Sequence, residues 1–203
     1  MEPLDVRRTK PAESNAKLPL RETASQTAGP YVHIGCLPNM AGIQGVFPQD
    51  LISNGEIGAG EKIMISGQVF EGDRIVCKDI MLEFWQADTK GSYQNGVWHR
   101  AGTNLETGIF QVETIMPGAV QQTSGETLAP FINVWVVARG INIGLLTRIY
   151  FQHFGELNAR DPHLALVPAE RRKTLIARAG DATNHYEFDV HLQGANETVF
   201  FET

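Results

Sequence analysis

The chain has 203 residues, of which 42% are hydrophobic and 20% charged, a composition typical of one folded domain that excludes wholesale disorder. Its formal net charge of −6 has the wrong sign for a protein that binds nucleic acid by neutralising phosphates. No apolar run approaches the roughly 18 residues of a membrane span, and the two cysteines are too few for a disulfide framework.

Residues 1–22 are charged, contain proline and show neither helical nor strand periodicity, so we expect an extended N-terminal arm. They also lack the apolar core of a signal peptide, which favours a cytoplasmic location. From residue 23 small side chains dominate up to a turn signal at Gly29 and Pro30, which β-formers follow. The glycine-rich segment 36–61 indicates a long irregular connection. We therefore divide the chain into an arm (1–22) and one domain (23–203).

Alternation of apolar and polar residues predicts several short strands. It is clear in 63–69 and clearest in 186–192, where Tyr, Phe, Val and Leu alternate with Glu, Asp and His. Helix signals are confined to 168–177, which has proline near its first turn and good helix formers after it. Short strands separated by turn residues are typical of a sandwich, so we expect an all-β fold, an antiparallel β-sandwich with long loops and one short helix. The other expected strands are 80–85, 108–115, 131–139, 145–151 and 198–201.

No self-contained catalytic constellation is visible in the sequence. The six histidines never form His-x-His, and no Cys-x-x-Cys occurs, so no zinc or iron centre is expected from the residues alone. Ser66 and Ser124 lack the Gly-x-Ser-x-Gly elbow, and Cys77 is expected to be a small core residue. Arg139 ends an apolar strand, where a fixed cation could bind a carboxylate through two hydrogen bonds. A solvated strand-end charge is the alternative for Arg139, and likewise for Arg148.

Residues 67–93, GQVFEGDRIVCKDIMLEFWQADTKGSY, resemble the signature of the intradiol ring-cleavage dioxygenases. Within that family the chain is most similar to the iron-free α chains of the two-chain enzymes that cleave protocatechuate. Three further blocks carry this likeness: SQTAGPYVHIG at 25–35, ARGINI at 138–143 and QGANETVFF at 193–201. The resemblance extends over nearly the whole chain from residue 23. It implies the prealbumin-like β-sandwich of the family.

The resemblance implies a non-haem ferric iron held by two tyrosines and two histidines, which binds the two catecholic oxygens of the substrate. Here the corresponding positions carry Val120, Phe131 and Asn133, and the loop 94–98 has no phenol where the other tyrosine is expected. All four ligands are therefore missing, so we expect no metal in this chain. The resemblance implies that Fe³⁺ is held instead by a partner β chain, and that this chain alone is inactive.

A contribution to substrate binding is also implied by the resemblance. In such enzymes the catalytic pocket lies at the α/β interface, and one wall comes from a small-residue loop and an arginine of the α chain. In this sequence those residues are Thr27, Gly29, Pro30, Tyr31 and Arg139. Glycine and proline let the backbone approach an aromatic ring, tyrosine adds a flat wall with a polar tip, and arginine complements a carboxylate. The expected assembly is a hetero-oligomer that opens 3,4-dihydroxybenzoate with O₂ to 3-carboxy-cis,cis-muconate.

Two other functions stay open on the sequence. The chain could be a catalytically inactive structural or binding β-sandwich that oligomerises with itself. It could also be an independent metal-free enzyme, which needs a nucleophile or an acid–base pair that the sequence does not display. An obligate partner predicts a large apolar interface, and hence aggregation or weak folding when this chain is produced alone.

Overall fold

The computed structural model describes residues 27–29, 31–46 and 58–202, so the expected arm at 1–22 lies outside the described residues. No helix in this part of the chain is long and apolar enough to cross a membrane. The strands are β1 (Lys62–Phe70), β2 (Val76–Cys77), β3 (Ile80–Gln86), β4 (Val97–Gly102), β5 (Ile109–Ile115), β6 (Val120–Gln121), β7 (Thr127–Leu128), β8 (Phe131–Ala138), β9 (Leu145–Phe151), β10 (Ile176–Ala179), β11 (His185–Glu187) and β12 (Val190–His191). The helices are α1 (Tyr31–Cys36), α2 (Gly155–Arg160) and α3 (Pro162–Leu166), with 3₁₀ turns at Gly72–Arg74, Gln152–Phe154 and Arg172–Leu175.

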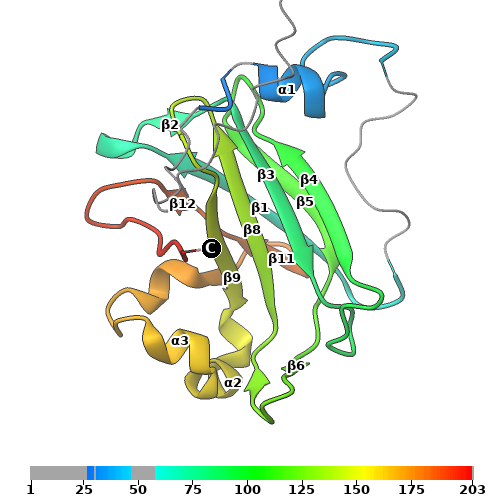
Figure 1. Cartoon of the computed structure of the whole chain (residues 1–203), viewed down its shortest axis with the longest axis vertical. Coiled ribbons are helices and arrows are strands. Elements are labelled where there is room, and N and C mark those ends of the chain that lie inside the picture. The colour runs from blue at the N-terminus through cyan, green and yellow to red at the C-terminus, as the bar shows by residue number, and fades with distance from the viewer. Residues whose placement is uncertain (1–26, 30, 47–57, 203) are drawn as a thin grey trace, which may run out of the picture.

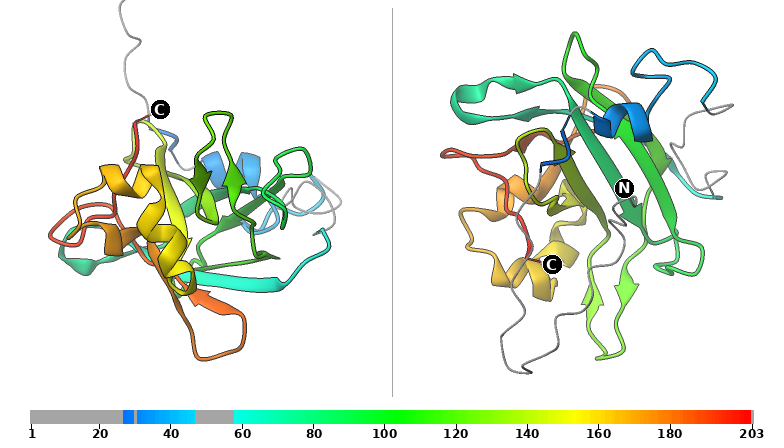
Figure 2. Two further views of the ribbon diagram at one scale, coloured as in Figure 1. Left: turned by 90° about the horizontal axis from the view of Figure 1, so that it is seen from below. Right: turned by 45° about the horizontal axis from the view of Figure 1, so that its top comes forward.

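Two β-layers face each other and are joined along one side by β10 (Figures 1 and 2). The first layer has the order β4–β3–β8–β9 and is antiparallel throughout. In the second layer β5 and β2 pair antiparallel with β1, whereas β11 and β12 pair parallel with it. Strand β10 pairs with β9 of the first layer and β11 of the second, so the sheet curls round on itself.

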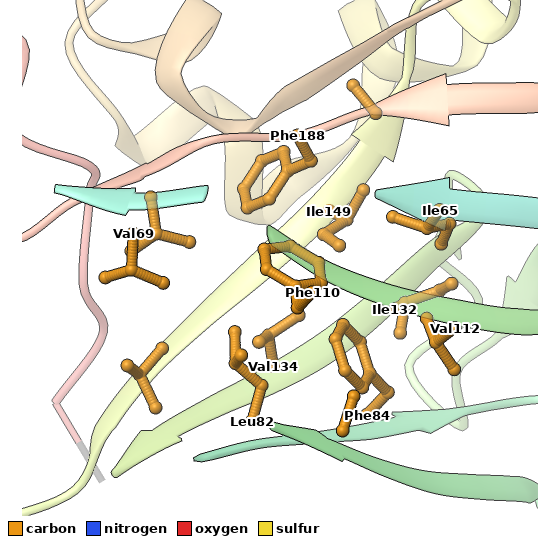
Figure 3. Close-up of a cluster of buried hydrophobic side chains, with 14 of the residues drawn as sticks. Ile65, Val69, Leu82, Phe84, Phe110, Val112, Ile132, Val134, Ile149 and Phe188 are labelled. Carbon is orange, nitrogen blue, oxygen red and sulfur yellow. The ribbon is translucent and has the colours of Figure 1, made fainter. Parts of the chain in front are cut away.

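Apolar side chains from both layers point into one core between them (Figure 3). Alternate residues of β1, β3, β5 and β8 face inward, because successive side chains of a strand point to opposite faces. Phe84 of β3 and Phe110 of β5 are in contact, with ring centroids 5.9 Å apart. Burying a side chain of this size stabilises the fold by roughly 2–3 kcal/mol. The core therefore depends on both layers at once.

Gly67 on β1 allows the backbone between β11 and β12 to approach the sheet. A Cβ at this position would lie 1.8 Å from the carbonyl oxygen of Phe188. The close approach places the Phe188 N–H 2.9 Å from the Ser66 carbonyl oxygen, to which it donates, and the Phe188 side chain enters the core (Figure 3). A side chain at Gly67 would therefore push away the segment around Phe188, which connects β11 to β12 where both pair with β1.

The sequence-based fold class, a mostly β sandwich, is confirmed. Within it the pairs β1–β11, β1–β12 and β9–β10 are parallel rather than antiparallel. The strands expected at 63–69, 80–85, 108–115, 131–139 and 145–151 all occur, within one residue at either end.

Three local predictions are wrong. The strand expected at 186–192 is interrupted because Phe188 turns into the core and the carboxylate of Asp189 accepts the backbone N–H of Gln68 at 3.0 Å. In 198–201 a single bridge forms, between Phe201 and Leu146. The helix expected at 168–177 is a 3₁₀ turn followed by β10, since pairing with β9 outweighs local helix propensity.

Helices cover the outer face of the first layer at both ends (Figure 1). At one end Leu37, just after α1, is buried against Met81 and Val137, and residues 31–36 form a helix although Tyr31 and Val32 are β-forming residue types. At the other end Leu164 of α3 packs in a cluster with Phe131 of β8 and its neighbours. Between these two ends the described residues leave the outer face partly open, and Trp85 of β3 and Trp135 of β8 are exposed there.

Candidate functional site

At the end of β8 the structure brings residues 27–29 next to the predicted arginine. The Oγ1 of Thr27 accepts a hydrogen bond from the backbone N–H of Gly140 at 2.7 Å, although the two residues are 113 positions apart. Gly140 has a φ of +90°, a left-handed conformation that costs glycine little. Gly29, two residues after Thr27, has a φ of +67°. Thr27 and Gly29 thus lie in the same corner of the molecule as Arg139.

Arg139 projects from this corner as an exposed cation. Its Nη2 lies 2.5 Å from the Oδ2 of Asp79, and the arginine side chain is 61% exposed. An ion pair of this exposure is worth less than about 1 kcal/mol, so another carboxylate can displace Asp79 at little cost. The planar guanidinium presents two parallel N–H groups to such a carboxylate. The corner can therefore bind an anionic substituent of a small molecule.

Two of the five predicted wall residues are described in part or not at all. Pro30 lies outside the described residues, and Tyr31 begins α1, where only its backbone is described. Val32 and Cys36 of the same helix pack on the cluster around Leu37, which fixes α1 beside the corner. The roles assigned to Pro30 and Tyr31 stay predictions.

The positions where the resemblance implies metal ligands lie near the opposite end of β8. Val120 and Phe131 pack in one apolar cluster with Tyr150, and Asn133 follows two residues along the strand. The amide of Asn133 hydrogen-bonds to Tyr93, whose pKa is raised chiefly by burial. Valine and phenylalanine offer no donor atom, and an amide is a poor substitute for the imidazole that ferric iron takes. These residues do not fit a ferric site, and no group of three or more His, Cys, Asp or Glu gathers elsewhere among the described residues.

Arg148 adds a positive charge at the same place. It lies opposite Asn133 in the β8–β9 register. Its guanidinium carbon is 4.3 Å from the ring centroid of Phe131 and 5.4 Å from that of Phe201. The Nη1 donates to the Oη of Tyr150 at 3.3 Å. A fixed cation here opposes binding of a metal ion by charge repulsion, in addition to the missing ligands.

The corner and the positions where the resemblance implies metal ligands are far apart within one chain. Asn133 and Arg139 are six residues apart along β8 and its end, and at about 3.3 Å per residue this is about 20 Å. A one-ring substrate held by Arg139 cannot span that distance. If the corner serves a metal-bound substrate, the metal must belong to another chain.

The open part of the outer face carries large apolar side chains. We call it the open strip and define it by Trp85, Asn133, Trp135, Leu146 and Arg148, which the strand registers place side by side. Trp85 is 39% and Trp135 44% exposed. Exposed tryptophans close together on one face are typical of a protein–protein interface.

One hydrogen-bonded pair resembles part of a hydrolytic site. The Oγ of Ser66 and the Nε2 of His185 are 2.7 Å apart. Among the described residues no carboxylate hydrogen-bonds to the other ring nitrogen of His185, and Ser66 lies within a strand rather than on a sharp turn. The pair is an ordinary hydrogen bond between neighbouring strands. It gives the metal-free enzyme hypothesis no support.

A cavity of about 600 Å³ lies beside β10, β11 and β12, and none of the predicted site residues lines it. The carboxylates in its lining already have partners: Glu187 lies 3.7 Å from the Nη2 of Arg178, and Asp189 accepts from a backbone N–H. Cavity size therefore does not locate the function here.

Sequence reasoning missed two carboxylates, Asp161 beside Tyr150 and Asp79 beside Arg139. Asp161 is fully buried and accepts backbone N–H groups from His163, Leu164 and Ala129. The Asp161-Pro162 pair is a helix-start signal that could have predicted α3. Asp79 is 60 positions from its partner Arg139, and nothing in the sequence pattern signals that contact.

Comparisons with known proteins agree with the fold. No protein-family model matches the chain. The chain is 40% identical over 196 residues to the protocatechuate 3,4-dioxygenase alpha chain of Pseudomonas putida, covering 90% of this chain and 97% of that one. The alpha chain of Burkholderia cepacia is 39% identical over 199 residues, covering 90% and 98%. The Burkholderia cepacia beta chain is 28% identical over 171 residues, covering 74% and 72%.

Solved structures with the same architecture are more distant in sequence. An intradiol ring-cleavage dioxygenase from Tetranychus urticae superposes with a TM-score of 0.55 at 15% identity, covering 76% of this chain and 94% of that one. Catechol 1,2-dioxygenase from Acinetobacter radioresistens gives 0.54 at 17% identity, covering 71% and 56%. At these identities the likeness concerns the fold alone.

Proposed function

The chain belongs to the family of protocatechuate 3,4-dioxygenase alpha chains, and on that basis we propose that it is the iron-free subunit of a two-chain protocatechuate dioxygenase. The enzyme would open the ring of 3,4-dihydroxybenzoate with O₂ to give 3-carboxy-cis,cis-muconate. One observation carries the proposal: the corner at Arg139 lies about 20 Å along β8 from Asn133, one of the positions where the resemblance implies metal ligands. A substrate held at that corner can therefore reach a metal only if the metal belongs to another chain.

The partner in this proposal is a β chain that holds Fe³⁺. The same fold serves both roles, since this chain also aligns with a beta chain over 74% of its length. The iron supplies the ring-cleaving chemistry, and this chain supplies binding geometry. Phe131 and Asn133 offer no ligand that would compete with the partner for iron.

The role of this chain is to complete one wall of the substrate pocket. We assign this wall to Thr27, Gly29, Pro30, Tyr31 and Arg139. The guanidinium of Arg139 binds the substrate carboxylate and so fixes which edge of the ring faces the partner's iron. Thr27 supports this arrangement, because its hydrogen bond with Gly140 holds residues 27–29 against the turn beside Arg139.

The open strip provides a surface on which the partner can dock. Trp85 and Trp135 are large, rigid and half exposed, which suits residues that anchor an interface. The ion pair between Arg100 and Glu83, with 2.6 Å between Nη2 and Oε1, borders them and leaves that edge electrically neutral. From the likeness to bacterial alpha chains we also propose that the assembled enzyme is cytoplasmic.

A reconstitution experiment tests the proposal. This chain and a β chain encoded in the same genome are produced separately and together, and protocatechuate-dependent O₂ uptake is measured for each. We expect aggregation or a weakly folded monomer from this chain alone, and soluble, active protein from co-expression. A well-behaved monomer with a sharp melting transition that does not change the activity of the β chain would contradict the proposal and favour a self-associating sandwich.

A further inference from the structure

Helix α1 is too short to hold its own position. It has six residues, Tyr31–Cys36, and an isolated helix of this length is unstable in water, because too few hydrogen bonds form to offset the cost of the first turn. Its last carbonyl groups also lack partners within the helix. Contacts with the rest of the molecule must therefore fix both its conformation and its place.

One such contact comes from Arg100 on β4. Its Nη1 donates to the backbone carbonyl oxygen of Cys36, the last residue of α1, at 3.4 Å. Basic side chains can satisfy the carbonyl groups that a helix leaves open at its C-terminus. The two residues are 64 positions apart, so the contact joins α1 to a distant part of the chain.

The guanidinium of Arg100 is itself held in place. Its Nε and Nη2 both donate to the Oε1 of Glu83, at 2.9 and 2.6 Å, and Glu83 lies directly opposite it in the β3–β4 register. The guanidinium carbon is 4.9 Å from the ring centroid of Trp98, within the range of a cation–π contact. The side chains of Arg100 and Glu83 are only 16% and 18% exposed, so solvent screens this pair little. These contacts fix the guanidinium while its Nη1 bonds to α1.

The chain that follows α1 lies directly on the same part of β4. Gly102 is two residues after Arg100, so both belong to the same face of the strand. A Cβ at Gly102 would overlap the Sδ of Met40 and would lie 3.0 Å from the Cδ1 of Leu37. Leu37 is itself buried in a cluster with two residues of the first layer. Arg100 and this close approach together attach the C-terminal end of α1 to the sheet.

From these contacts we propose that Arg100 is a positioning residue of the substrate pocket, which sets the place of the wall through α1. The inference rests on the proposed function, in which Tyr31, the first residue of α1, belongs to that wall. The segment is then held at both ends, because Thr27 is hydrogen-bonded to the turn after β8 and Cys36 to Arg100. In this role Arg100 acts through the helix, whereas Arg139 binds the substrate directly.

A displaced wall has a kinetic signature that differs from the loss of Arg139. The wall faces the ring, which protocatechuate and catechol share, whereas Arg139 faces the carboxylate, which catechol lacks. Loss of Arg100 should therefore raise KM for both substrates, by about fivefold or more, since a displacement of about 1 Å can cost far more than that. The value of kcat changes less, because the iron and its ligands belong to the partner.

The experiment uses the assembled complex with wild-type chain, Arg100→Gln and Arg100→Lys. Lysine keeps the charge that pairs with Glu83, but a single ammonium group cannot replace the planar fork that reaches Glu83 and α1 at the same time. The matched control is Arg178→Gln. Arg178 also lies opposite a glutamate of the neighbouring strand, and no hydrogen bond joins it to a helix among the described residues. Steady-state O₂ uptake gives kcat and KM for each substrate, and hydrogen exchange of residues 31–46 reports how firmly α1 is held.

We expect a raised KM for both substrates in both Arg100 variants, with exchange of residues 31–46 at least about threefold faster, and wild-type values in Arg178→Gln. A residue that served stability alone would lower the melting temperature and the amount of active enzyme but leave KM unchanged. Wild-type KM values in Arg100→Lys therefore overturn the inference, and so does a KM that rises for protocatechuate only. Should Arg100→Gln fail to fold, Arg100→Lys decides by the same criteria.

This test separates the inference from the proposed function. If the wild-type chain forms no active complex with any β chain, the proposed function fails, and the role of Arg100 in the wall fails with it. If the complex is active and Arg139→Ala raises KM for protocatechuate, while Arg100→Lys keeps wild-type KM values, only the inference fails.

Discussion

Replacing Arg139 by alanine should weaken the use of protocatechuate without unfolding the protein. A charge-assisted hydrogen bond to a carboxylate contributes about 1–3 kcal/mol, so kcat/KM in the assembled enzyme should fall by roughly 5–150-fold. The ion pair with Asp79 is lost as well, but its side chains are 61% and 35% exposed, so the cost in unfolding free energy is below about 1 kcal/mol. Steady-state O₂ uptake and thermal melting of the same preparation measure the two effects.

The matched control is Asp79→Asn, which removes the same ion pair and leaves Arg139 free. It should reproduce the small change in melting temperature and leave kcat/KM for protocatechuate at or above the wild-type value. The binding of catechol, which lacks the carboxylate, should be the same in wild-type enzyme and Arg139→Ala. The reasoning is refuted if Arg139→Ala leaves kcat and KM unchanged, or if Asp79→Asn loses as much activity as Arg139→Ala.

Two further predictions concern stability and are measured on the assembled complex. Gly67→Ala would place a Cβ 1.8 Å from backbone at Phe188, so it should cost at least about 2 kcal/mol and lower the melting temperature by about 4 °C or more. Gly155→Ala, where a Cβ meets nothing within 4 Å, is the control, and equal melting temperatures for both variants would count against the close approach. Burial raises the pKa of Tyr150 from 10 to about 12. The neutral phenol therefore contributes its full share to the free energy of unfolding below pH 10, and this share is lost as the pH rises through 12. This share of the free energy of unfolding is about 2–3 kcal/mol. Tyr150→Phe should therefore flatten the fall in melting temperature between pH 10 and 12. A pH profile identical to that of the wild type would show that Tyr150 does not titrate there.

The strands of the core could be predicted because their pattern is local. Ile63 and Ile65 alternate with polar or less buried neighbours on β1, and both are buried as the two-residue period requires. Such features follow from residues close together in sequence. The reason why position 67 must be glycine is different, since it lies in the distant Phe188 and is visible only in the folded chain.

What the sequence could not predict depends on contacts between distant residues. Tyr31 and Val32 are β-formers, yet they begin a helix because the segment around Leu37 is buried on Met81 and Val137. The position of Arg148 beside Phe131 depends on the register of β8 against β9 and on the return of the C-terminal segment to Phe201. No local pattern encodes that register. The wall at Thr27 was inferred from the resemblance, and its contact with Gly140 needed the folded chain.

Native mass spectrometry of the complex purified from its own host, followed by stepwise dissociation, tests the central claim most directly. The account predicts a heteromer in which a partner of different mass retains the iron and this chain leaves metal-free. A complex that contains this chain alone, or iron that stays with this chain after dissociation, would contradict the assignment of an iron-free subunit.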